Sequence, residues 1–439
     1  MIINPAKSKI FYGWFVIGLG TLGVLMSVPG QTIGVSAFTD YLLKALNLTR
    51  GQLSTAYMFG TISSSFMLTF AGKMYDRHGA RKVAAAAALG LGGILIYMSF
   101  SDVISTGMVS LIPGLPDWIL SFVVIFIGFF LLRFFGQGAL TLSSRNMIME
   151  WFENRRGLAN ALSGPFIAVG FSSAPLLFDF LINNYSWQEA WQLLAIFFGF
   201  AFTVIVLVFY KDKPEKFGLT PDGKQSEEAR NRRIKRNKVW YEFSLKEARH
   251  KFAFWVFIIS LSMFALYITG FTFHVVDIFE QVGIGRQKAL SIFLPTSVIA
   301  FSLNALGSWL SDYIKLKHLY KAIALGGILS TSGLVLLEYS WAYYIIIIGN
   351  GMLHGMFGVL SAITWPKYFG RKHLGAISGF NQSFNVFFSA VGPWIFSQSL
   401  TFTASYTTAA FIIMAVWGFL FVAAFFANNP QLKMQEKEE

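Results

Sequence analysis

Apolar segments about as long as a membrane is thick recur along the whole chain of 439 residues, and short polar segments separate them. A transmembrane α-helix needs about 20 mostly apolar residues, so this pattern predicts a polytopic α-helical membrane protein. A transmembrane barrel would instead show short segments of alternating polarity. The twelve predicted spans are residues 11–38, 52–72, 82–100, 118–146, 157–181, 187–209, 252–276, 288–311, 320–338, 341–366, 374–397 and 405–427, which places both chain ends on one side of the bilayer.

The composition agrees with this class. The chain is 55% hydrophobic and 13% charged, with a mean hydropathy of +0.56, which excludes an ordinary soluble globular protein. The first apolar segment is too long for a signal peptide, and we expect it to be the first span. Because the chain has no cysteine, disulfides, thiol catalysis and cysteine-based metal sites are excluded.

The net charge of +13 would suit a nucleic-acid-binding protein, but the distribution of the charge argues against that function. Of the 35 Lys and Arg residues, 29 fall on the side of the chain ends, whereas Lys44, Arg50, Arg286 and Lys288 fall on the other side. Cytoplasmic loops of membrane proteins carry an excess of Lys and Arg. We therefore expect a multi-pass protein of the cell (inner) membrane with both termini in the cytoplasm, and no nucleic-acid partner.

The fourth predicted span holds the other two basic residues, Arg133 and Arg145. The helix from Trp118 to Arg156 would be about 57 Å long, against about 30 Å for the hydrocarbon core, which puts Arg133 near mid-bilayer. A guanidinium there costs at least ~2.5 kcal/mol, so Arg133 is expected to face a cavity or a partner. Arg145 is expected to reach the cytoplasmic interface and to anchor the inner end of the span.

An internal repeat divides the chain into two halves. Asp76 matches Asp312 and Arg50 matches Arg286 at one offset, and the outer loop Ser101–Asp117 accounts for a shorter offset in the later spans. The predicted organisation is a six-helix bundle at 1–210, a basic cytoplasmic linker at 211–251, a second bundle at 252–428 and a tail at 429–439. The linker is expected to end in a short amphipathic helix on the inner leaflet, with Ser244 and Glu247 as its capping box.

The loop from Gly72 to Lys82 reads Gly-Lys-Met-Tyr-Asp-Arg-His-Gly-Ala-Arg-Lys, and it resembles the signature between spans two and three of the major facilitator superfamily. The resemblance extends over essentially the whole chain. It implies twelve transmembrane helices in two pseudo-symmetric six-helix bundles, and a central cavity lined by spans one, four, seven and ten. The residues expected to control conformational change are Gly72, Asp76, Arg77, Gly79, Arg81 and the repeat equivalent Asp312.

Polar residues on the cavity-lining spans are the candidate transport residues. Arg133 and Gln137 are four residues apart and share a helix face, as do Asn350 and His354 at the matching repeat positions. The expected substrate-binding set is Arg133, Gln31, Gln137, Tyr267, Asn350, His354, Asn381 and Asn385, and the expected proton-coupling set is His274, Asp277 and His354. Each has a structural alternative: Arg133 can bond across to span one or two, the amides can join helices, and His354 can be a core histidine.

Catalytic motifs are absent from the sequence. We find no nucleotide-binding loop, dinucleotide fingerprint, histidine pair for zinc or nucleophile elbow. The chain is therefore not expected to be an enzyme or to hold a cofactor or metal. Transport would draw its energy from gradients.

Some stretches are similar to the monocarboxylate and oxalate/formate porter branch of the superfamily, namely Phe11–Trp14, Pro29–Thr32, Thr269–His274 and Gly218–Gly223. That branch often holds the carboxylate with a basic residue in span eight or eleven, and neither span has one here. The positive partner is then expected to be Arg133 or a protonated histidine.

The predicted function is therefore transport of a small organic anion, a monocarboxylate, with protons, by alternating access in a monomer. The alternatives are an anion exchanger of the oxalate/formate type, a transporter of sugars or other neutral solutes, and a non-transporting sensor or scaffold.

Overall fold

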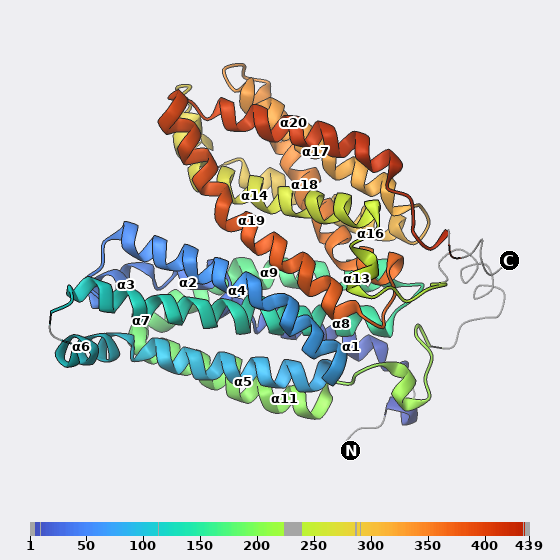
Figure 1. Cartoon of the computed structure of the whole chain (residues 1–439), viewed down its shortest axis with the longest axis horizontal. Coiled ribbons are helices and arrows are strands. Elements are labelled where there is room, and N and C mark those ends of the chain that lie inside the picture. The colour runs from blue at the N-terminus through green and yellow to red at the C-terminus, as the bar shows by residue number, and fades with distance from the viewer. Residues whose placement is uncertain are drawn as a thin grey trace. The chain divides into compact units, whose positions relative to one another are not determined.

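The computed structural model describes residues 5–8, 10–112, 114–223, 239–285, 288–289, 291–432 and 434. Within these ranges all regular secondary structure is helical, as Figure 1 shows. The central part of the predicted linker, residues 224–238, and most of the predicted tail, residues 433 and 435–439, lie outside the described residues.

Each of the twelve predicted apolar segments corresponds to one helix or to consecutive helical pieces (Figure 1). Nine of the predicted segments correspond to single helices. These are α4 (Arg50–His78), α5 (Ala80–Ser99), α9 (Arg156–Asn184), α14 (Phe252–Glu280), α16 (Phe293–Ser311), α17 (Leu316–Val335), α18 (Ala342–Tyr368), α19 (Leu374–Thr403) and α20 (Thr407–Phe426). The fourth span is α7 (Asp117–Leu132), η3 (Arg133–Leu140) and α8 (Thr141–Trp151), and the sixth is α10 (Trp187–Leu194), η4 (Ala195–Ala201) and α11 (Phe202–Phe209). By length and composition alone, eight of the described helical stretches could cross a membrane.

The first span is broken, as the Pro29-Gly30 pair predicts. Its pieces are α1 (Gly13–Leu25), the 3₁₀ turn η2 (Val28–Gly30), α2 (Thr32–Ser36) and α3 (Thr39–Ala45). Gln31 has an extended backbone, with φ −90° and ψ 157°. The break leaves backbone carbonyl groups without helical partners, and such groups can accept hydrogen bonds from other helices.

The fourth span contains a π-helical segment, η3, which the sequence did not predict. At Gly136 in this segment, a β-carbon would lie 2.7 Å from the α-carbon of Gly30. Only glycine therefore allows η3 to approach η2 so closely. Single π turns inside α-helices are often found at functional sites.

The expected outer loop Ser101–Asp117 is wrong in part, because residues Ser101–Leu111 form the helix α6. The hydroxyls of Ser105 on α6 and Ser121 on α7 are hydrogen-bonded at 2.8 Å, and this contact packs the short helix against the start of the fourth span. This helix was not predicted because its 11 residues are too few, and too mixed in polarity, to form an apolar segment of membrane length.

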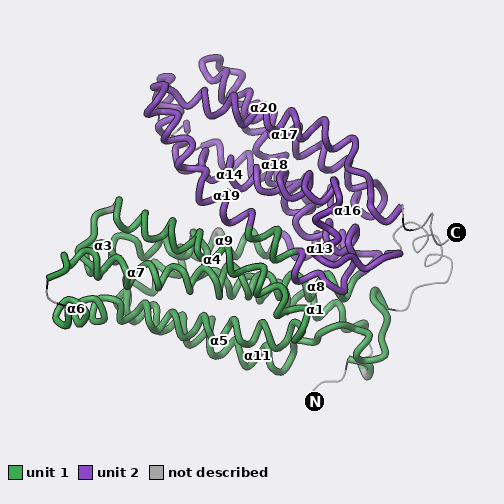
Figure 2. The backbone as a smooth tube through the Cα atoms, in the orientation of Figure 1, with its two compact units in different colours: residues 1–152, 165–224, 378–383 green, residues 153–164, 225–377, 384–439 purple. Residues whose placement is uncertain are grey.

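The chain forms two compact units, drawn in Figure 2. Unit 1 comprises Met1–Phe152, Pro165–Lys224 and Ser378–Ser383, and unit 2 comprises Glu153–Gly164, Gln225–Ile377 and Phe384–Glu439. Two short pieces are thus exchanged: the start of α9 packs within unit 2, and one turn of α19 packs within unit 1. In unit 1, for example, Ser383 is hydrogen-bonded to Thr69 of α4 at 3.2 Å.

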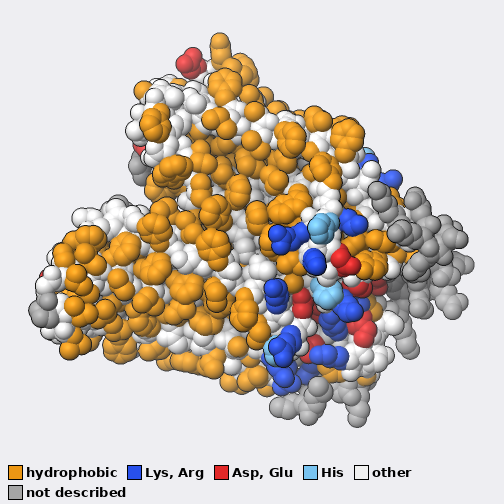
Figure 3. Space-filling view, viewed as in Figure 1, with side chains coloured by type: hydrophobic (Ala, Val, Ile, Leu, Met, Phe, Trp, Pro, Cys, Tyr) orange, Lys and Arg blue, Asp and Glu red, His pale blue; other side chains and the backbone are white. Residues whose placement is uncertain are grey.

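The face of the molecule drawn in Figure 3 is largely apolar, and most of the charged side chains visible on it lie near α8 in unit 1 and near α13 (Leu245–Ala248) in unit 2. Large apolar side chains are widely exposed along the spans, among them Phe66 at 72%, Phe166 at 68% and Leu294 at 76%. Apolar exposure on this scale fits helices surrounded by lipid rather than water.

Candidate functional site

Arg133 is buried inside unit 1, with only 3% of its surface exposed. One terminal nitrogen donates to the carbonyl oxygen of Gly30 at 3.3 Å and to the hydroxyl of Thr32 at 3.2 Å. Its guanidinium lies 5.3 Å from the centre of the Tyr57 ring, and the Tyr57 hydroxyl donates to Thr32. The buried Nε has no hydrogen-bond partner. The structural alternative for Arg133, a bond across to span one, is thus present.

The break in span one positions these groups. Gly30 ends the turn η2, so its carbonyl is free to accept from another helix. A β-carbon on Gly30 would lie 2.5 Å from the carbonyl oxygen of Leu132, so the close approach of the two spans depends on this glycine. The break at Pro29 and Gly30 therefore places the carbonyl group of Gly30 next to the guanidinium of Arg133.

A second polar group in unit 1 surrounds Gln31. Its side-chain nitrogen donates to the hydroxyls of Ser27 at 3.1 Å and Thr141 at 3.3 Å, and Thr141 donates to Ser27 at 2.9 Å. Gln137, one turn before Thr141, has a buried side-chain oxygen without a partner, and so has Asn381 in the exchanged turn of α19. Thr141 was not predicted, although its place four residues after Gln137 marks the same helix face.

In unit 2, Tyr267 and Asn350 are joined through one serine. The Tyr267 hydroxyl and Ser330 lie 2.7 Å apart, and Ser330 donates to the side-chain oxygen of Asn350 at 2.8 Å. Tyr267 is fully buried and Asn350 is 2% exposed. These groups hold α14, α17 and α18 together, so both polar side chains already have partners within unit 2.

The other predicted amide and histidine of unit 2 have different surroundings. Asn385 is buried and accepts from Ser262 of α14 at 3.3 Å, while its side-chain nitrogen has no partner. His354 is exposed within the described chain, and its ring stands edge-on to Phe264 with 5.1 Å between centres. His354 is therefore not a hydrogen-bonded core histidine.

His274 has a partner at each ring nitrogen. Its Nε2 lies 3.0 Å from the carbonyl oxygen of Pro393, and its Nδ1 lies 3.2 Å from the hydroxyl of Tyr406. Because a carbonyl can only accept, Nε2 carries a proton, and in the neutral form of the ring Nδ1 accepts from the Tyr406 hydroxyl. Asp277 follows three residues later on α14 and is exposed. The predicted pair His274 and Asp277 is thus extended by Tyr406, which the sequence did not reveal.

The signature segment Gly72–Lys82 of unit 1 contacts Asp212, a residue that was not predicted from the sequence. Asp212 accepts from the backbone nitrogen of Arg81 at 3.1 Å and pairs with Lys216 at 2.7 Å. Gly79 has φ +85°, and a β-carbon there would lie 2.4 Å from the Asp212 carboxylate. Both facts require glycine at this corner. Burial and the charge of Arg81 lower the pKa of the neighbouring Lys211.

The remaining signature residues lie on α4. Gly72 is within its last two turns, where a β-carbon on Gly379 would lie 3.2 Å from the Gly72 α-carbon. Asp76 and Arg77 lie in the final turn of the same helix. The repeat equivalent Asp312 follows α16 in unit 2 and accepts from the backbone nitrogen of Gly157.

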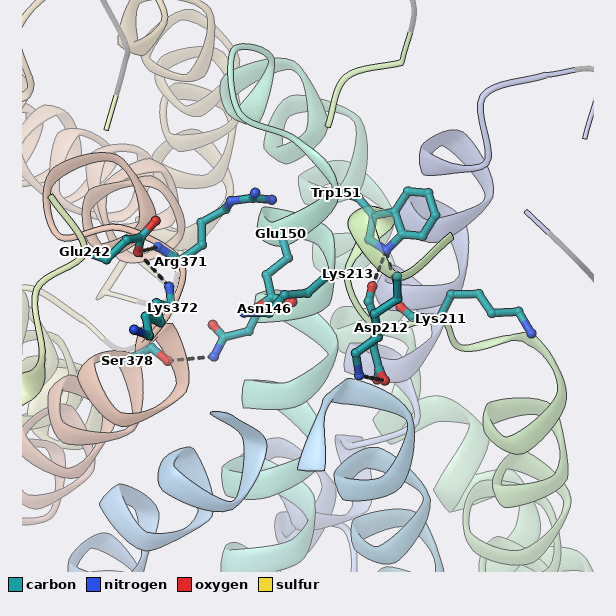
Figure 4. Close-up of polar contacts among 11 residues, drawn as sticks. Asn146, Glu150, Trp151, Lys211, Asp212, Lys213, Glu242, Arg371, Lys372 and Ser378 are labelled. Carbon is teal, nitrogen blue, oxygen red and sulfur yellow. Dashed lines mark hydrogen bonds and ion pairs between the residues drawn. The ribbon is translucent and has the colours of Figure 1, made fainter. Parts of the chain in front are cut away.

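Figure 4 shows further contacts at the charged end of each unit. In unit 1, Trp151 donates to the carbonyl of Asp212 at 2.5 Å, Lys213 pairs with the buried Glu150 at 3.3 Å, and Asn146 donates to Ser378 at 2.7 Å. In unit 2, the carboxylate of Glu242 accepts from two successive backbone nitrogens of the α18–α19 loop at 2.6 and 2.7 Å. Among the described residues, no cluster of three metal-ligating side chains was found.

The comparisons with known proteins agree with this architecture. A family model described as the Major Facilitator Superfamily matches residues 19–393. The chain belongs to the Major Facilitator Superfamily. It is therefore a multi-pass membrane transporter, and its predicted fold class of twelve helices in two pseudo-symmetric bundles is confirmed.

Solved superfamily structures share the fold at low sequence identity. The proton:xylose symporter XylE bound to 6-bromo-6-deoxy-D-glucose has a TM-score of 0.66 and 15% identity, over 94% of this chain and 95% of that one. FucP in the outward conformation has a TM-score of 0.61 and 14% identity, over 95% and 99%. No curated protein sequence matches the chain. The predicted monocarboxylate branch thus stays a prediction.

Proposed function

We propose that the chain is a secondary active transporter of a small organic anion, a monocarboxylate, that moves together with protons. Unit 1 binds the anion through Arg133, with Gln137, Gln31 and Asn381 as orienting groups. Unit 2 carries the proton-coupling groups His274 and Asp277, with His354 and Asn385 as further contacts. The signature residues and Asp312 govern the change between conformations.

The observation that carries the proposal is the uncompensated charge of Arg133. Among the described residues it has no carboxylate partner, although it is almost fully buried within the fourth span. A buried charge without a counter-charge is costly, so its retention favours an anionic ligand. The contacts with Gly30 and Thr32 orient the guanidinium but do not neutralise it. An anion near Arg133 would supply the missing charge.

The unpartnered oxygens of Gln137 and Asn381 narrow the ligand class. An ionised carboxylate can only accept hydrogen bonds, whereas a hydroxyl can donate one. A 2-hydroxy acid offers a carboxylate for Arg133 and a hydroxyl donor for an amide oxygen. We therefore propose 2-hydroxy monocarboxylates, such as lactate, ahead of simple acids such as acetate.

Proton coupling is proposed at His274. Protonation makes both ring nitrogens donors, so the hydrogen bond between Nδ1 and Tyr406 must reverse, while Nε2 keeps its bond to Pro393. Protonation of His274 on α14 would therefore alter its hydrogen bonds with α19 and with the start of α20. On α14, the charged residue nearest to His274 is Asp277. The ring of Phe396 on α19 stacks on His274 and carries no charge.

Sugar transport is the second candidate. XylE is titled a proton:xylose symporter, and the amides of Gln31, Gln137 and Asn381 suit hydroxyl groups. A neutral sugar, however, would leave the charge of Arg133 uncompensated. Exchange of oxalate and formate, in contrast, would use the same guanidinium.

The charge distribution also supports the orientation and location proposed from the sequence, with both termini in the cytoplasm of a cell with an inner membrane. We propose a monomer as the functional unit.

Uptake into proteoliposomes tests the proposal. Labelled lactate, pyruvate, oxalate, xylose and a cationic dye are compared with and without an inward proton gradient. We expect acid-stimulated lactate accumulation, reduced at least about tenfold by Arg133→Gln because a charge-assisted hydrogen bond is lost. Lys44→Gln, which removes an exposed cation of unit 1, is the matched control and should transport normally.

Arg133 also stabilises η2, so folding needs a separate measurement. Arg133→Lys keeps the charge, and it should retain a lactate-dependent thermal shift that Arg133→Gln lacks at equal monodispersity. Xylose uptake without carboxylate uptake would replace the anion proposal with the sugar one.

A further inference from the structure

The helix α8, the cytoplasmic half of the fourth span, has no side that faces lipid. Nine of its eleven residues are buried, and only Thr141 and Arg145 are partly accessible. The sequence predicted that Arg145 would extend to the membrane interface and anchor the helix. A helix packed on all its other faces leaves little surface for lipid, so the partial accessibility of Arg145 favours a role other than anchoring.

The accessible positions form one stripe. Gln137, Thr141 and Arg145 are spaced by four residues and are all partly accessible, so they follow one face of the helix. Thr141 contacts Gln31 and Ser27 of the first span, which places this face beside the break in span one. The stripe thus begins beside the proposed anion-binding groups and leads toward the charged end of unit 1.

The rotation of α8 is fixed on both sides of Arg145. Ser144 is fully buried and bonds to the Tyr210 hydroxyl at 2.9 Å, and Asn146 is 5% exposed and donates to Ser378. Arg145 is consequently held on the remaining face and cannot turn away without breaking these contacts.

Arg145 has no counter-charge within the described chain. It forms no hydrogen bond or ion pair with a described residue, and its Nε is buried without a partner. The acidic residue that follows it on α8, Glu150, is itself engaged by Lys213. A membrane-embedded guanidinium that lacks both a lipid headgroup surface and a carboxylate partner is costly unless a ligand uses it.

We infer that Arg145 is a second binding position for the transported small anion, about three helical turns beyond the proposed first position. The two arginines are twelve residues apart, about 18 Å along the helix axis. Thr141 lies between them, so the stripe provides a charged group, two polar groups and a second charged group in order. A carboxylate leaving Arg133 would find its next positive partner at Arg145. The ligand class rests on the proposed function, whereas the position of the site rests on the accessibility of Arg145.

Arginine labelling tests the inference without relying on transport. The purified protein is treated with phenylglyoxal with and without lactate or inorganic phosphate, and peptide mass spectrometry follows Arg133, Arg145 and the exposed Arg249. We expect Arg145 to react, and lactate to slow that reaction about tenfold at saturation, as complete occupancy of a charge-assisted contact would. Arg249 should be unaffected.

Each outcome has a distinct meaning. Protection of Arg133 alone, or an Arg145 that does not react, overturns this inference and leaves the proposed function intact. Protection of Arg145 alone supports the inference and overturns the role of Arg133. Protection of neither residue by lactate or phosphate overturns both.

Exchange kinetics provide a second test in proteoliposomes. Arg145→Gln should slow lactate exchange about tenfold while leaving equilibrium lactate binding at Arg133 within about twofold, because only the second position is lost. Arg145→Lys should retain most of the exchange rate. Unchanged exchange in a folded Arg145→Gln protein would overturn the inference, and should this variant fail to fold, the labelling result decides.

Discussion

The carboxylate of Asp312 accepts a hydrogen bond from the backbone nitrogen of Gly157, with 3.3 Å between the two atoms. Gly157 is the second residue of α9, where backbone N–H groups lack partners within the helix. Asp312, just after α16, thus caps a helix more than 150 residues away in sequence. A negative charge at a helix N-terminus also interacts favourably with the helix dipole. The conformational role that the repeat predicted for Asp312 stays a prediction, whereas the contact itself assigns Asp312 a place in the packing of α9.

Neutralising this cap should destabilise the packing of α9 on α16. We expect Asp312→Asn to lower the free energy of unfolding by about 0.5–2 kcal/mol, since the amide keeps an acceptor but loses the charge. Thermal unfolding in detergent measures the effect. Glu338→Gln, which removes an exposed carboxylate elsewhere in unit 2, should leave the melting temperature unchanged, and an equal shift in both variants would rule out a specific cap.

Gly157 should tolerate no side chain. A β-carbon there would lie 1.9 Å from the backbone carbonyl oxygen of Ser308, which cannot move without displacing α16. Gly157→Ala should therefore cost about 1–3 kcal/mol, as overpacking usually does. Gly418→Ala on α20, where a β-carbon would meet nothing within 4 Å, should be neutral or slightly stabilising. A Gly157→Ala protein as stable as the control would contradict the close packing.

Much of this fold follows from periodicity alone, because a span must bury about 20 residues in hydrocarbon. The break at Pro29 and the capping box at Ser244 were also predictable, since both depend on local backbone chemistry. The predicted short amphipathic helix corresponds to the four residues of α13.

The π-helix at Arg133 and the role of Asp212 were not predictable in the same way. Both depend on residues far apart in sequence: the Gly30–Gly136 approach and the corner at Gly79. The repeat identified Asp312, but pairwise spacing could not identify Gly157 as its partner. The packing around Arg145 was also not predictable, because the sequence does not reveal which faces of a span are packed.

The capping box of α13 should respond to acid. Hydrogen bonds from Tyr241 and from the Ser244 side chain and backbone lower the pKa of Glu247 to about 2. A depressed carboxyl pKa stabilises the folded segment above the unfolded value near 4.3, and this contribution is lost as the pH falls toward about 2. Hydrogen exchange of residues 240–248 should therefore accelerate below about pH 4 relative to the rest of unit 2. In Glu247→Gln this acid-dependent step should disappear.

His274 should govern the response of transport to external pH. We expect His274→Gln to abolish acid stimulation of lactate uptake, because glutamine cannot take up a proton. Tyr406→Phe removes the partner of Nδ1 and should change the pH profile without removing stimulation. Uptake at several external pH values measures both effects. His250→Gln, an exposed histidine next to α13, is the control, and unchanged stimulation in His274→Gln would leave His354 as the candidate.

Thr269 should stabilise the contact between α14 and α19, because Pro393 leaves a backbone carbonyl of α19 without its helical donor. Proline has no N–H, so the carbonyl of Ser389, four residues earlier, loses its helical donor. The Thr269 hydroxyl of α14 lies 2.9 Å from that oxygen and donates to it, while also lying near carbonyls of its own helix. Thr269→Val should therefore cost about 1–3 kcal/mol, the penalty for an unsatisfied buried carbonyl.

A second substitution separates this effect from simple loss of a hydroxyl. Pro393→Ala restores an N–H for Ser389, so Thr269→Val should cost less in that background, and the difference is measured by a double-mutant cycle of thermal unfolding. Thr401→Val on the same helix α19, whose hydroxyl bonds only within the helix and is exposed, should cost little in either background. Equal costs of Thr269→Val with and without Pro393 would mean that Thr269 does not serve the carbonyl that the proline frees.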